Sequence, residues 1–314
     1  MTASAIDRWF GRKTEAYYAH GDGLYPIIRS NSIFQHSDGS HTMIISPHAT
    51  STRKSGVSLT LVFLLACCSL TMNALSQIAP ASNSSYRLVL PEKDKMLSEE
   101  LTRYIDKGLF TIEEFFQLPF QKSFEVYVQT SRKGLDAFFQ QRWKVEKTEC
   151  WMVAAGVADF MVVLSPRAWQ EQACDHNPDE LQHVQDIITH ELIHVLHAQH
   201  NPSKEFEGMD SLSWFVEGLA TYASGQIEHA HQTDAREAVE SGQAPTQLST
   251  AWSGRYRYGV CGSLVEYIYK RYGKEILKSL LPVTEQFKAL GILGVSEEEF
   301  LSKWKNYVMN NEIN

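Results

Sequence analysis

Two histidines and a glutamate between residues 190 and 194 have the types and the spacing needed for metal chemistry. The segment has the sequence HELIH, an HExxH motif. Residues four apart on an α-helix lie on one face, so His190 and His194 can offer ring nitrogens to a single ion. Zn²⁺ takes such ligands at about 2.0–2.1 Å, and catalytic sites hold it with three protein ligands and a water. Glu191 stands beside the first histidine, where its carboxylate could act on that water as a general base.

The motif lies in a segment whose pattern predicts a partly buried helix. From Leu181 to His197, apolar residues form one broad face that is built to pack against a core. These residues are Val184, Ile187, Ile188, Leu192, Ile193, Val195 and Leu196. We expect the helix to end at Asn201, because the residue before Pro202 is disfavoured in the α conformation. Buried histidines need polar partners, so the alternative of two surface histidines on an ordinary helix is less favoured.

Glu217 is the predicted third ligand. It follows His194 by 23 residues and lies in the apolar run 214–222, which predicts a second helix. A carboxylate inside such a run is costly unless a cation or hydrogen bonds satisfy it. Gly218, the next residue, would let two backbones approach closely. A salt bridge from Glu217 to an arginine or lysine is the alternative.

A second candidate for the third ligand is His200, the last position of the metzincin pattern HExxHxxGxxH. That pattern needs a glycine where this chain has His197, so that the helix can turn at positive φ. Histidine adopts that conformation poorly. We therefore expect His197 and His200 to be polar residues near the helix C-terminus, where partial positive charge is favoured.

HELIH at 190–194, WFVEGLA at 214–220 and the block around Tyr258 together resemble the gluzincin metallopeptidases, in particular bacterial peptidase MA-like proteins. The resemblance covers about residues 85 to 308. It implies that His190, His194 and Glu217 hold Zn²⁺, which lowers the pKa of a bound water towards about 7. It also implies that Glu191 is the general base, as its place in the motif suggests.

The same resemblance assigns a role to Tyr258, which precedes a helix and could hydrogen-bond the oxyanion that forms during peptide hydrolysis. Tyr256 is the nearest competitor for this role, and simple packing is the alternative for either tyrosine. In thermolysin-like members a carboxylate four residues after the ligand glutamate supports a histidine, but this chain has Thr221 there. Asp186, one turn before His190, is the candidate for that support.

The resemblance favours an endopeptidase over an exopeptidase. The Gly-x-Met-Glu-Asn segment that captures a free N-terminus in related aminopeptidases is absent from the sequence. A peptide or protein is thus the expected substrate. One rival function is an exported zincin-like binding protein without peptidase turnover. Another is a structural zinc site whose fourth position is closed by His197 or His200.

Composition excludes little but argues against nucleic acid as a partner. The net charge is −8, and no basic stripe with interleaved aromatic residues is present. The 314 residues, 43% of them hydrophobic, are enough for a sizeable core.

The N-terminal part predicts export. Residues 1–42 show little periodicity and stay unassigned, either disordered or preceding the true start at Met43. Residues 43–76 have the form of a signal peptide or a membrane anchor, and residues 57–79 are long enough for a membrane tether. Lipid attachment at Cys67 is a third alternative, and residues 77–84 resemble a linker. Each alternative makes the protein extracellular, periplasmic or membrane-anchored.

The remaining patterns predict an α+β fold with a zincin-like catalytic domain, in which a small mixed sheet lies over the HExxH helix. Residues 85–200 form the α/β half, and residues 201–314 form a mainly helical half that carries the third ligand. Strands are expected at 86–90, 124–128 and 160–164, and helices at 96–117 and 131–143.

Three further features remain open in the sequence. The stretch 154–159 is either a sheet edge that could pair with an extended peptide or a plain turn at Ala155-Gly156. Cys150 and Cys174 could form a disulfide in an oxidising compartment, which would leave Cys261 unpaired and buried. His229 and His231 are expected to be solvated on a polar helix end rather than bound to a metal.

Overall fold

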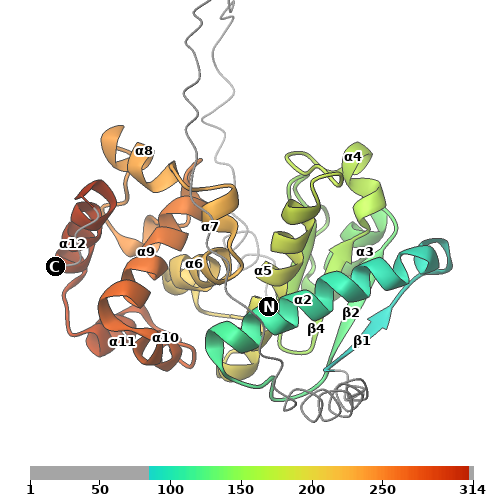
Figure 1. Ribbon diagram of the computed structural model, residues 1–314, viewed down its shortest axis with the longest axis horizontal. Helices are drawn as coiled ribbons and strands as arrows, with labels where there is room; N and C mark the ends of the chain where they lie inside the picture. Colours follow the sequence, from blue (N-terminus) through green and yellow to red (C-terminus); the bar gives the residue numbers. More distant parts are fainter. Residues whose placement is uncertain (1–84, 311–314) are drawn as a thin grey trace, which may run out of the picture. The chain divides into compact units, whose positions relative to one another are not determined.

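The computed structural model describes residues 85–310, and these residues form an α+β domain (Figure 1). All of its strands precede the helix that carries the HExxH motif. The elements of this part are β1 (Tyr86–Val89), α2 (Ser98–Phe116), β2 (Phe124–Gln129), α3 (Arg132–Trp143), β3 (Ala154–Val157), β4 (Phe160–Leu164), α4 (Trp169–Gln172) and α5 (Leu181–His200). The predicted fold class is thus confirmed at the level of α+β.

The sheet has the strand order β1-β2-β4-β3, with β1, β2 and β4 parallel and β3 antiparallel. Every residue of the central strand β4 is buried, as expected where both faces of a strand are covered. In β2, burial alternates along the strand, and its inward residues are Phe124, Val126 and Val128. The strands predicted at 86–90, 124–128 and 160–164 are therefore present, within a residue at each end.

The stretch 154–159 is a strand followed by a turn, so of the two alternatives the sheet edge is the one found, and Ala155-Gly156 is not a turn. β3 lies at the edge of the sheet, and the chain turns only at Ala158-Asp159. A Cβ atom on Gly156 would lie 2.2 Å from the backbone oxygen of Glu191. Only glycine allows this approach, which holds the edge strand directly against α5.

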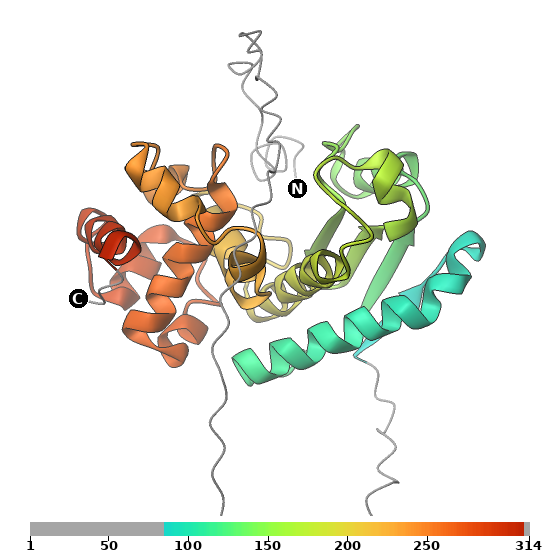
Figure 2. The same cartoon turned by 45° about the horizontal axis from the view of Figure 1, so that its top comes forward.

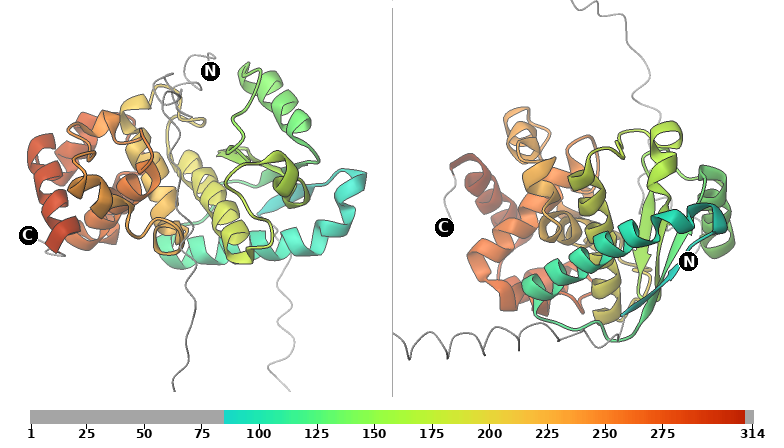
Figure 3. Two further views of the ribbon diagram at one scale, coloured as in Figure 1. Left: turned by 90° about the horizontal axis from the view of Figure 1, so that it is seen from above. Right: turned by 45° about the vertical axis from the view of Figure 1, so that its right-hand side comes forward.

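The chain after α5 is helical. Its helices are α6 (Ser213–Ala223), α7 (Gln226–His229), α8 (Asp234–Glu240), α9 (Arg257–Tyr272), α10 (Lys274–Ser279), α11 (Gln286–Leu293) and α12 (Glu297–Asn310). They gather on the side of α5 opposite the strands, as Figures 2 and 3 show. α6 packs against both α5 and α9. The motif helix therefore lies between the sheet and the helical part.

α5 itself is fully helical from Leu181 to His200, and Asn201 leaves the helix with extended backbone angles, as predicted. Helix α2 lies beside α5 (Figure 1) and packs against it. α2 begins at Ser98 rather than at Met96, after a short 3-10 helix. Phe110 is 65% exposed, because the buried face of α2 follows Leu101, Ile105 and Ile112.

Cys150 and Cys174 form a disulfide with their Cα atoms 5.3 Å apart, so the predicted pairing is confirmed. The bond ties the loop before β3 to the segment after α4. Cys261 is buried and free, as expected. Between residues 85 and 310, no helix is both long and apolar enough to cross a lipid bilayer. The segments predicted as unassigned (1–42), signal or anchor (43–76) and linker (77–84), and Cys67, lie outside the described residues.

The contact between α6 and α9 depends on Gly218. A Cβ atom there would lie 2.3 Å from the carbonyl oxygen of Cys261 and 2.7 Å from its carbonyl carbon. This confirms that Gly218 permits a close approach of two backbones. Since Glu217 is the preceding residue, the same contact fixes where its side chain points.

We expect Gly218→Ala to lower the free energy of unfolding by about 1–3 kcal/mol, because the new methyl group must push two helix backbones apart. The control is Gly291→Ala in α11, where a Cβ atom would meet nothing within 4 Å. That variant should be neutral or stabilise by up to about 1 kcal/mol, as alanine favours helix over glycine. Urea unfolding of both variants measures the difference, and equal effects would contradict the packing argument.

Candidate metal centre

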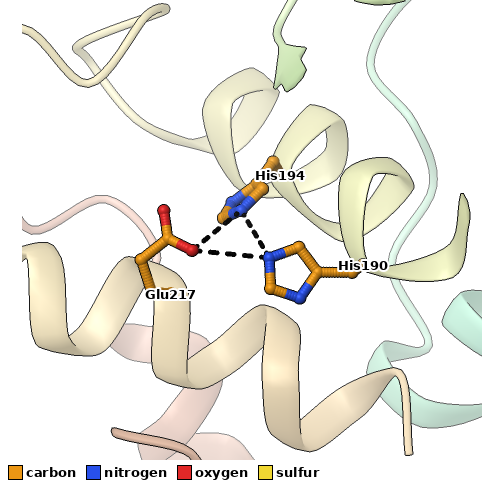
Figure 4. Close-up of side chains that lie close together, drawn as sticks. All are labelled: His190, His194 and Glu217. Carbon is orange, nitrogen blue, oxygen red and sulfur yellow. Dashed lines mark hydrogen bonds and ion pairs between the residues drawn. The ribbon is translucent and has the colours of Figure 1, made fainter. Parts of the chain in front are cut away.

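His190, His194 and Glu217 come together from two helices, with their side chains pointing toward one another (Figure 4). The Nε2 atoms of His190 and His194 are 3.0 Å apart. Oε2 of Glu217 lies 3.4 Å from Nε2 of His190 and 3.6 Å from Nε2 of His194. Ligands at about 2.0–2.1 Å from a tetrahedral ion are separated by about 3.3 Å. The three donor atoms therefore already have the spacing of a zinc ligand set.

All three residues are buried, with exposed fractions of 5 to 6%. Burial alone would raise the pKa of the Glu217 carboxyl, but the charges and hydrogen bonds of the two histidines outweigh it and bring this pKa to about 2. For His194, burial by itself would lower the pKa. The charge of the adjacent Glu217 carboxylate and its hydrogen bond outweigh this effect, so the pKa of His194 is raised. A buried anion with two imidazoles is a donor set that suits a cation.

No fourth His, Cys, Asp or Glu joins this group within residues 85–310. His200 points elsewhere, with its Nε2 atom 2.9 Å from the carbonyl oxygen of Pro119 and its Nδ1 atom 3.3 Å from Gln121. His197 is fully buried and packs on the rings of Phe206 and Phe215. Neither His197 nor His200 therefore offers a fourth ligand to an ion held by His190, His194 and Glu217.

The prediction for His197 is wrong, because this residue carries no positive charge at the end of α5. Burial lowers the pKa of His197 to about 3, and the nearby His194 acts in the same direction. The helix C-terminus cannot compensate for this loss of hydration. His197 is therefore a core residue of α5 itself.

The outer nitrogen of His190 is held by Gln226, at the start of α7, and not by Asp186. Nδ1 of His190 and Oε1 of Gln226 are 2.8 Å apart, so the ring donates a proton there and its Nε2 atom is free to bind a cation. Asp186 instead accepts a hydrogen bond from Gln182 and pairs with His229. The prediction that Asp186 supports His190 is therefore wrong. The sequence has no local signal for Gln226, since a turn at Gly225 (φ 88°) places it.

His229 and His231 keep contact with solvent, as predicted, but each is also paired with a carboxylate. Nδ1 of His229 lies 2.8 Å from Oδ2 of Asp186, and Nδ1 of His231 lies 2.8 Å from Oδ2 of Asp234. The first pair links α7 to α5. The second pair lies beside Tyr258, whose ring stacks on His231 at 5.3 Å between centroids. Neither histidine joins the metal group.

Glu191 lies next to the ligands and is partly exposed. Burial of its carboxylate raises the pKa above the ordinary value, and the charge of Glu217 adds to this. His194, His190 and a hydrogen bond from the Gly156 backbone act in the opposite direction. A carboxylate with a raised pKa, next to three residues that could hold a metal ion, has the properties of a general base.

Tyr258 lies at the site and Tyr256 does not. The Tyr258 ring centroid is 6.4 Å from that of His190, and burial together with the charges of Glu217 and Glu191 raises the pKa of its phenol. Its hydroxyl therefore stays protonated and can donate a hydrogen bond. Tyr256 is buried in the helical part, with the guanidinium of Arg255 over its ring.

Comparison of the chain with protein-family models, with curated proteins and with solved structures gave no match in any of the three. The interpretation of the site therefore rests on its own residues and their geometry.

We expect the neutral His197 to make the protein sensitive to acid. Between about pH 6.5 and 3 the unfolded chain binds a proton at this histidine and the folded chain does not. The contribution of neutral His197 to the free energy of unfolding is therefore complete above about pH 6.5 and shrinks as the pH falls. His197→Leu should lose less stability over that range than the wild type. Urea unfolding at pH 7, 6, 5 and 4 with a chelator present measures both curves, and parallel curves would contradict the assignment.

We expect Gln226→Leu to weaken binding of Zn²⁺ by roughly 10- to 100-fold, because the leucine cannot accept the Nδ1 proton that orients His190. Asp186→Asn is the matched control and should change the affinity little, since this carboxylate bonds to His229. Competition with a chromophoric chelator gives both dissociation constants. The reverse order of effects would make Asp186 the supporting residue.

Proposed function

We propose that this protein is a zinc-dependent metallopeptidase of the gluzincin type, with His190, His194 and Glu217 as the ligands. The observation that carries the proposal is the spacing of the three donor atoms, 3.0 to 3.6 Å apart, contributed by two helices and buried together. The absence of a fourth protein ligand among residues 85–310 favours a catalytic site over a structural one.

The architecture supports a zincin-like fold. A small mixed sheet lies next to the motif helix, and its antiparallel edge strand β3 packs on α5 at Gly156. The free side of an edge strand offers backbone N–H and C=O groups to an extended peptide. β3 is therefore the surface along which a substrate peptide would lie, with its scissile bond beside Glu191.

Zn²⁺ bound to the three ligands would activate water as a nucleophile and polarise the substrate carbonyl. Glu191 takes the proton of the attacking water and passes it to the leaving amine. Tyr258 donates a hydrogen bond to the carbonyl oxygen as negative charge develops there. Gln226 keeps the His190 ring in the tautomer whose Nε2 atom faces the other ligands.

Export of the catalytic domain forms part of the proposal. The disulfide between Cys150 and Cys174 supports it, because such bonds persist in oxidising compartments and are rare in the cytosol. The substrate would then be a peptide or protein outside the cytoplasm, and residues 43–76 would direct or anchor the chain.

The test is zinc content and hydrolysis of casein and of a peptide library by the wild type, Glu191→Gln and Glu217→Ala. The wild type should bind about one zinc and cleave. Glu191→Gln should keep the zinc but lose at least about 100-fold in kcat, since it removes the general base. Glu217→Ala should lose the metal. Glu298→Gln, an exposed change in α12, is the control and should behave as the wild type.

Two outcomes would contradict the proposal. Retention of zinc by Glu217→Ala would remove Glu217 from the ligand set. Zinc binding by the wild type without cleavage of any library peptide would favour an exported binding protein that has the site but no turnover.

A further inference from the structure

Arg257, the first residue of α9, holds its cation between aromatic rings from both parts of the domain. The carbon Cζ of its guanidinium is 4.5 Å from the ring centroid of Trp151, 5.3 Å from that of Trp252 and 5.4 Å from that of Tyr258. Trp151 belongs to the loop before β3, and the other two rings belong to the helical part. The guanidinium therefore contacts side chains from both the loop before β3 and the helical part.

Arg257 forms no salt bridge with a carboxylate of residues 85–310. Its neighbour Arg255 has one, with Nη2 3.6 Å from Oε2 of Glu237. Arg142 pairs with Glu205 in the same way. Aromatic faces attract a guanidinium, but they do not use its planar fork of N–H donors. Within residues 85–310, a hydrogen bond with Tyr258 occupies part of that fork, and no carboxylate occupies the rest.

The cation is also close to the metal group. Tyr258 links the two, since its ring centroid is 6.4 Å from that of His190 and 5.4 Å from Cζ of Arg257. Together these steps do not exceed the length of about four extended residues, at roughly 3.3 Å each. If a peptide binds with its scissile bond next to His190, His194 and Glu217, a residue within about four positions of that bond can reach the guanidinium.

We infer that Arg257 is a specificity residue that binds a carboxylate of the substrate, either an acidic side chain within about four residues of the scissile bond or the C-terminal carboxylate. This inference rests on the proposed peptidase function and adds the substrate class to it. Carboxylate and guanidinium form two parallel charge-assisted hydrogen bonds, which select for anionic over neutral groups of the same shape. The rings of Trp151 and Trp252 fix the guanidinium in place before the substrate arrives, so little side-chain entropy is lost on binding.

The experiment uses matched peptides that differ only in charge. One series replaces Glu by Gln at each position around the cleavage site, and another replaces the free C-terminus by an amide. Cleavage by the wild type gives kcat/KM, and fluorescence anisotropy of labelled peptides on zinc-loaded Glu191→Gln protein gives binding without turnover. Both readouts are repeated with Arg257→Met, which keeps the length of the stem but removes the charge, and with Arg255→Met as the control.

At one position, or at the C-terminus, the wild-type chain should prefer the carboxylate by roughly 10- to 100-fold. Arg257→Met should abolish that preference, mainly through weaker binding of the anionic peptide, while Arg255→Met keeps it. If the Glu-to-Gln series loses binding, Arg257 recognises an acidic side chain of the substrate. If the amidated series loses binding, it recognises the C-terminal carboxylate. Because each comparison is a ratio within one variant, any effect of Arg257 on Tyr258 or on folding cancels.

Equal binding of acidic and amide peptides by the wild-type site would overturn the inference, and so would a preference that survives in Arg257→Met. Neither result would affect the proposed function if neutral peptides are cleaved. Conversely, a carboxylate preference in binding that depends on Arg257, without cleavage by the wild type, would support the inference and contradict turnover.

Discussion

The constraint on which the rest of the site depends is the burial of the Glu217 carboxylate. An ionised carboxylate without a partner is very costly in a protein interior, yet Glu217 is 6% exposed in the middle of an apolar helix. Its position follows from backbone contact, because Gly218 places α6 against the carbonyl group of Cys261. The two histidines of α5 satisfy the charge, and a divalent cation would satisfy it more fully. The packing of α6 against α9 thus sets the position of the carboxylate on which the chemistry of the site depends.

A second close contact fixes the other side of the site. Gly156 allows β3 to touch α5 at Glu191, so the edge strand and Glu191, the proposed general base, are held at a set distance. The loop before β3 is tied by the disulfide at Cys150 and carries Trp151 toward Arg257. Substrate backbone, reacting carbonyl and substrate charge would then be recognised by parts of the chain that touch one another. Contacts between elements far apart in the sequence thus position the proposed functional groups.

Polar pairs between the elements around the ligands hold the site together. Gln226 and His229 both belong to α7, and they contact His190 and Asp186 on α5 respectively. One short helix thus supports two positions on the ligand helix, one turn apart. On α5, neutral His197 lies in the core, where its imidazole packs against the rings of Phe206 and Phe215.

The sequence by itself determined the features that depend on local spacing. The four-residue interval between His190 and His194 places both on one helix face, Pro202 ends that helix, and the strand patterns define an α+β domain. Tertiary structure decided which distant groups meet them. Gln226 rather than Asp186 supports His190, and Tyr258 rather than Tyr256 faces the site, because the turn at Gly225 and the contact between α6 and α9 orient those helices. Periodicity along a chain fixes the direction of a side chain within its own element, but only packing between elements fixes which partner it reaches.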